Sequence, residues 1–136
     1  MRCAAAAVAA LAGLAMGACG GEARDLFLVT RSGDVPGAKL TLRVTDDGRA
    51  SCNGRPLVEI TSAQLIAARE SERDVEPAAR AQLRLAPGPQ PVFSYRVRTE
   101  EGGVAWSDDS PRQPAVLFKL AKLTRDVAKG PCRLAR

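Results

Sequence analysis

The side chains that could carry enzymatic chemistry are few in this 136-residue chain. Two pairs of adjacent carboxylates, Asp46-Asp47 and Asp108-Asp109, could serve acid–base catalysis or hold a cation. Neither pair lies in the Asp-x-Asp-x-Asp-Gly series of a calcium loop, and both stand where aspartate commonly hydrogen-bonds to a turn. The chain has no histidine, and no serine is flanked as in a Gly-x-Ser-x-Gly motif. The sequence therefore predicts no catalytic residues, no cofactor and no metal site.

Arginines at alternating strand positions are the better candidates for binding. Arg96 and Arg98 lie two residues apart in one predicted strand, and Arg43 lies in another. Side chains two apart on a strand share a face, and guanidinium groups suit carboxylates and phosphates. No aromatic residue stands between them, which argues against nucleic acid as the ligand. These three arginines could line an anion-binding face, or simply form a solvated strand surface.

The N-terminal residues predict export. Residues 1–18 begin with one basic residue, Arg2, and continue as a run of small and apolar residues. A retained membrane anchor is the competing interpretation, but the run is mostly alanine and glycine, and no cluster of basic residues follows it. We therefore expect a signal peptide at 1–18, a tether at 19–24 and one domain at 25–136.

The processing site has two interpretations. Met16-Gly17-Ala18-Cys19 resembles a lipobox, in which Cys19 would be acylated and would hold the protein on a membrane. Signal peptidase I could instead cut after Gly20 or Ala23, which would release the protein into the periplasm or the medium.

Cysteine parity predicts a disulfide. Cys3 leaves with the signal peptide, and Cys19 is either acylated or removed, so that Cys52 and Cys132 remain. An exported protein meets an oxidising environment, and we expect these two residues to be joined. The alternative is two buried free thiols.

Hydrophobic periodicity predicts the secondary structure. The segment Asp46-Asp47-Gly48 predicts a hairpin. Thr61 and Gln64 form a capping box for a helix that runs to about Glu76, where Pro77 kinks or ends it. A second helix is expected over residues 114–129, and strands over residues 26–30, 39–45, 49–53, 92–99 and 104–107. This order predicts an α+β fold: a small antiparallel sheet of four to five strands with two main helices packed on one face.

The loop after the first strand carries a family resemblance. Arg31-Ser32-Gly33, followed by a nearby glycine, the aromatic strand at 93–97 and a leucine-rich last helix, resembles the emfourin-like inhibitors of thermolysin-like zinc metalloproteases. The resemblance spans about residues 25–129, and the chain is also similar to uncharacterised exported lipoproteins of high-GC bacteria.

Two functions are expected from these features. The resemblance implies an exported, non-enzymatic inhibitor of a secreted metalloprotease. Prolines and glycines make the loop after the first strand its candidate contact surface, with Asp34 as an oxygen ligand for a catalytic zinc. This partner-binding loop consists of Ser32, Gly33, Asp34, Val35, Pro36 and Gly37. The alternative is a structural cell-envelope lipoprotein that binds an anionic polymer through Arg43, Arg96 and Arg98.

Overall fold

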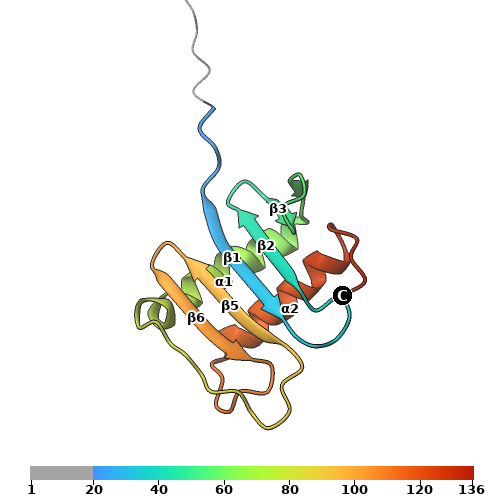
Figure 1. Ribbon diagram of the computed structural model, residues 1–136. Helices are drawn as coiled ribbons and strands as arrows, with labels where there is room; N and C mark the ends of the chain where they lie inside the picture. The colour runs from blue at the N-terminus through green and yellow to red at the C-terminus, as the bar shows by residue number, and fades with distance from the viewer. Residues whose placement is uncertain (1–19) are drawn as a thin grey trace, which may run out of the picture.

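The computed structural model describes residues 20–136, and they form a six-stranded antiparallel sheet with two helices. The strand order is β4-β3-β2-β1-β5-β6 (Figure 1). The α+β class is confirmed, and the sheet has one strand more than the four to five expected, because β4 is only two residues long. The strands are β1 Asp25–Ser32, β2 Leu40–Thr45, β3 Arg49–Cys52, β4 Val58–Glu59, β5 Ser94–Thr99 and β6 Gly102–Ser107.

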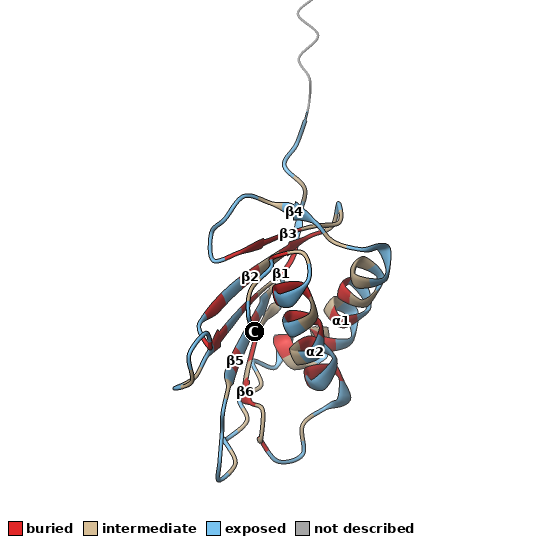
Figure 2. Ribbon diagram, turned by 90° about the vertical axis from the view of Figure 1, so that its right-hand side faces the viewer, coloured by how far each residue is buried: buried red, intermediate tan, exposed pale blue. Residues whose placement is uncertain are grey.

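Both helices cover the same face of the sheet. In Figure 1 the sheet lies in front of α1 (Ser62–Arg80) and α2 (Ala115–Lys129), and Figure 2 shows the two layers edge-on. The expected capping box is present, since Thr61 and Gln64 exchange both hydrogen bonds. Of the two expectations for Pro77, the one that it ends the helix near Glu76 is wrong, because α1 continues through Pro77 to Arg80. Pro77 sits in the last turn, where its missing N–H removes only one of the final helical hydrogen bonds.

Strand alternation separates a buried face from an open one. Val29, Leu42 and Val97 lie on adjacent strands, are fully buried and face the helices. Between them Thr30 and Arg96, which are paired across β1 and β5, are exposed on the opposite face.

Among residues 20–136, neither α1 nor α2 has the length and the apolar composition that a membrane-spanning helix needs. The predicted signal peptide and the lipidation residue Cys19 lie outside the described residues.

Candidate functional site

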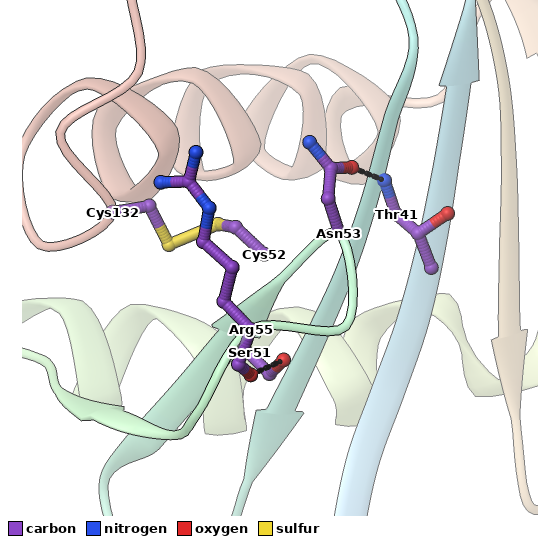
Figure 3. The surroundings of a disulfide bond; sticks show 6 residues. All are labelled: Thr41, Ser51, Cys52, Asn53, Arg55 and Cys132. Atoms are coloured by element: carbon purple, nitrogen blue, oxygen red, sulfur yellow. Dashed lines mark hydrogen bonds between the residues drawn. A yellow bond between two sulfur atoms is a disulfide. The ribbon is translucent and has the colours of Figure 1, made fainter.

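The predicted disulfide is confirmed. Cys52, at the end of β3, is bonded to Cys132, which follows α2, with a Cα–Cα distance of 6.1 Å. Two hydrogen bonds hold the turn after β3 beside it (Figure 3): the Thr41 N–H donates to Asn53 Oδ1 (2.9 Å), and the Ser51 hydroxyl donates to the Arg55 carbonyl (2.5 Å). Because it joins β3 to the residue after α2, the disulfide fixes the C-terminal end of α2 to the sheet.

The β1–β2 loop, residues 32–37, is held from inside by a buried arginine. Arg31 is 4% exposed, and its Nε and NH2 donate to the carbonyls of Ala38 (2.8 Å) and Gly37 (3.1 Å). Its guanidinium also lies 5.0 Å from the centre of the Phe93 ring. One side chain therefore closes the loop and contacts Phe93, the residue directly before β5.

Gly33 fixes the other end of the β1–β2 loop. A Cβ at this position would lie 2.3 Å from the carbonyl oxygen of Val92, a distance that real Cβ atoms do not tolerate. Only glycine lets the loop approach the segment before β5 so closely. At the far end, Gly37 has a φ of +76°, which favours glycine, and the Ala38 N–H donates to the Val35 carbonyl (3.1 Å). The loop thus has a defined shape.

The tip of the β1–β2 loop is free for contact. Asp34 and Pro36 are exposed, and Val35 is half-buried. No hydrogen bond or ion pair within the described chain engages the Asp34 carboxylate. The C-terminal Arg136 lies beside Gly37. The candidate loop residues are therefore brought together as an exposed turn on a fixed base.

A second loop packs beside the first and is also clamped. Residues 87–91, the proline segment, contain three prolines and precede β5. Asp109 accepts from the backbone N–H groups of Gly88 (2.9 Å) and Gln90 (2.7 Å), and Asp108 accepts from that of Val92 (3.0 Å). Both aspartates follow β6 and act as local backbone acceptors. Val92, which follows the segment, is 46% exposed.

The other carboxylate pair is occupied by nearby basic and polar groups. Asp46 accepts from Arg69 (2.8 Å). Hydrogen bonds from Arg49 and Thr45 lower the pKa of Asp47. Among residues 20–136, no three Cys, Asp or Glu side chains gather in a way that could hold a metal ion.

The three candidate arginines have different surroundings. Arg43 donates to Asp25 (2.6 Å) and Glu22 (2.8 Å), and these two hydrogen bonds raise its pKa above the ordinary arginine value. Arg96 and Arg98 are exposed on β5 and have no ion-pair partner among residues 20–136. All three lie on the open face, and Arg43 and Arg98 line one hollow, since both pair with Leu28. Only the charge of Arg43 is compensated, by Asp25 and Glu22.

The sequence did not predict the residues that hold the two loops in place, namely Arg31, Asp108 and Asp109. Arg31 alternates with Phe27 and Val29, so the period of two could have placed it on the buried face. The hydrogen bonds from the proline segment to Asp109, and from Val92 to Asp108, left no periodic signal.

No protein-family model, curated protein or solved structure matches the chain.

Proposed function

We propose that this chain is an exported, lipid-anchored, non-enzymatic binding protein that inhibits a secreted zinc metalloprotease through its β1–β2 loop. The observation that carries the proposal is the fixed base of the loop: Arg31 and Gly33 hold both ends while Asp34 and Pro36 stay exposed. A loop that is already ordered loses little conformational entropy on binding, which is how standard inhibitors gain affinity.

The chemistry of the loop tip suits a metalloprotease cleft. The Asp34 carboxylate supplies oxygen atoms, and a catalytic zinc keeps one coordination position open to such a ligand. Val35 offers an adjacent apolar side chain for a substrate pocket. The neighbouring proline segment and the exposed Val92 that follows it widen the contact surface at the same end of the sheet.

The position of the tether supports a membrane-anchored arrangement. The chain enters β1 at Asp25, six residues after Cys19, and the loop follows Ser32 at the opposite end of that strand (Figure 1). Eight residues of strand span roughly 26 Å at 3.3 Å per residue. An acyl chain on Cys19 would therefore leave the loop directed away from the membrane, toward soluble partners.

Substitutions at the loop tip test where the inhibitory surface lies. Titration of a thermolysin-like protease with the Val35→Asp variant should show inhibition weakened by about tenfold or more, because a charge would be placed in a desolvated contact. Asp34→Ala should also weaken inhibition, by removing the zinc ligand.

The matched control is Val58→Asp, which places the same charge on β4, at the edge of the sheet, where Val58 is already 37% exposed. This variant should inhibit like the wild type. Full inhibition by both loop variants would show that the β1–β2 loop is not the contact surface.

A further inference from the structure

One more arginine joins Arg96 and Arg98 on the open face. Arg84 follows α1 in a segment that pairs with the edge of β6: the Leu85 N–H donates to the Ala105 carbonyl (2.9 Å), and the Ala105 N–H donates to that of Leu83 (3.0 Å). Arg84, Arg96 and Arg98 line one hollow of about 390 Å³. All three are exposed, and none has an ion-pair partner within residues 20–136.

The acidic neighbours of this hollow are already engaged. Glu101 accepts from Arg80 (2.9 Å), and Glu100 lies 3.9 Å from an Arg24 nitrogen. Both glutamates line the hollow, but Glu101 is paired with an arginine outside it, and Glu100 is a highly exposed side chain that hydrogen-bonds to none of the three lining arginines. The three lining arginines therefore keep a local excess of positive charge.

A second hollow of about 470 Å³ continues along the same face. It shares Arg96 and Ala105 with the first, so the two hollows meet at these residues. Pro87 and Pro91 of the proline segment line this second hollow. Besides Arg96 and the buried Arg31, its polar lining includes four hydroxyl groups, those of Thr30, Ser32, Ser94 and Ser107. We call the two hollows together the arginine trough.

We infer that the arginine trough binds a polyanionic glycan, a polysaccharide chain with repeated carboxylate groups. Guanidinium groups bind carboxylates through paired hydrogen bonds, and the row of hydroxyls suits the neutral oxygens of sugar rings. A chain ligand could occupy both hollows at once, with successive carboxylates beside Arg84, Arg98 and the shared Arg96. Tyr95 and Trp106 are buried and stack on each other, so they offer no platform for nucleic acid bases.

This inference does not rest on the inhibitor proposal. The two surfaces share a border at Ser32 and the proline segment, but the arginine end of the trough, where the test is made, uses only β5, β6 and the segments next to them. Its probe is a polygalacturonate oligomer, with dextran of equal length as the uncharged control and poly-L-glutamate as the anionic peptide. The wild type should bind polygalacturonate at low ionic strength, lose affinity as salt is added, and leave dextran unbound.

The decisive variant is Arg96→Gln/Arg98→Gln, and affinity for polygalacturonate should fall by more than about tenfold because two charge-assisted contacts are removed. The matched control, Arg73→Gln/Lys129→Gln, removes the same net charge from exposed positions on the two helices and should bind like the wild type. Equal losses in both double variants would reduce the effect to net charge and overturn the inference. Tighter binding of poly-L-glutamate than of polygalacturonate would overturn the glycan as the ligand.

Discussion

Removal of the Cys52–Cys132 disulfide is expected to lower the free energy of unfolding by about 4 kcal/mol. The two cysteines are 80 positions apart, and a cross-link that closes so long a loop strongly restricts the unfolded chain. The loss should appear in urea unfolding of the Cys52→Ala/Cys132→Ala variant compared with the oxidised wild type. A loss of this size is a large fraction of the stability of a small domain.

The reduced wild type is the control for this experiment, since it loses the bond without losing the cysteine side chains. It should unfold at nearly the same urea concentration as the double variant. A difference of less than about 1 kcal/mol between oxidised and reduced protein would contradict the assigned role, because the chain-entropy term alone predicts several times more.

Replacement of Arg31 by Met is expected to cost about 2–3 kcal/mol of stability and to loosen the β1–β2 loop. Met retains the apolar stem but cannot donate to the carbonyls of Gly37 and Ala38, and hydrogen bonds from a charged group are worth more than neutral ones. The contact with Phe93 is lost as well. Hydrogen exchange at the Ala38 N–H, which donates to Val35, should become faster.

Arg31→Lys separates charge from geometry at the same position. Lys keeps the positive charge but not the planar fork that reaches two carbonyls at once, so we expect an effect between those of the wild type and Arg31→Met. If the proposed function holds, inhibition should weaken in the same order. Unchanged exchange at Ala38 in the Met variant would show that Arg31 does not fix the loop.

Local signals in the sequence predicted the framework of the fold. Asp46-Asp47-Gly48 forms the expected turn between β2 and β3, with Gly48 at a φ of +84°. The capping box correctly predicted where α1 begins, and the helical spacing of apolar residues after Pro114 correctly predicted α2. Cysteine parity predicted the disulfide without any knowledge of the distance between its partners.

Features that depend on tertiary contacts were not predictable in the same way. The two-residue strand β4 is too short for a periodic pattern, and α1 extends past Pro77 because its stability is set by packing on the sheet. Arg84 reaches the open face only because the segment after α1 pairs with β6. Such placements require long-range pairing that a single sequence does not reveal.

The most direct test of the proposed function is titration of a thermolysin-like metalloprotease with the oxidised wild-type domain. We expect peptidase activity to fall with one equivalent of the domain, at micromolar concentration or below, and to remain low on prolonged incubation because the fixed loop is not cleaved. Full protease activity in a micromolar excess of folded, disulfide-bonded domain would contradict the inhibitor proposal for that protease class.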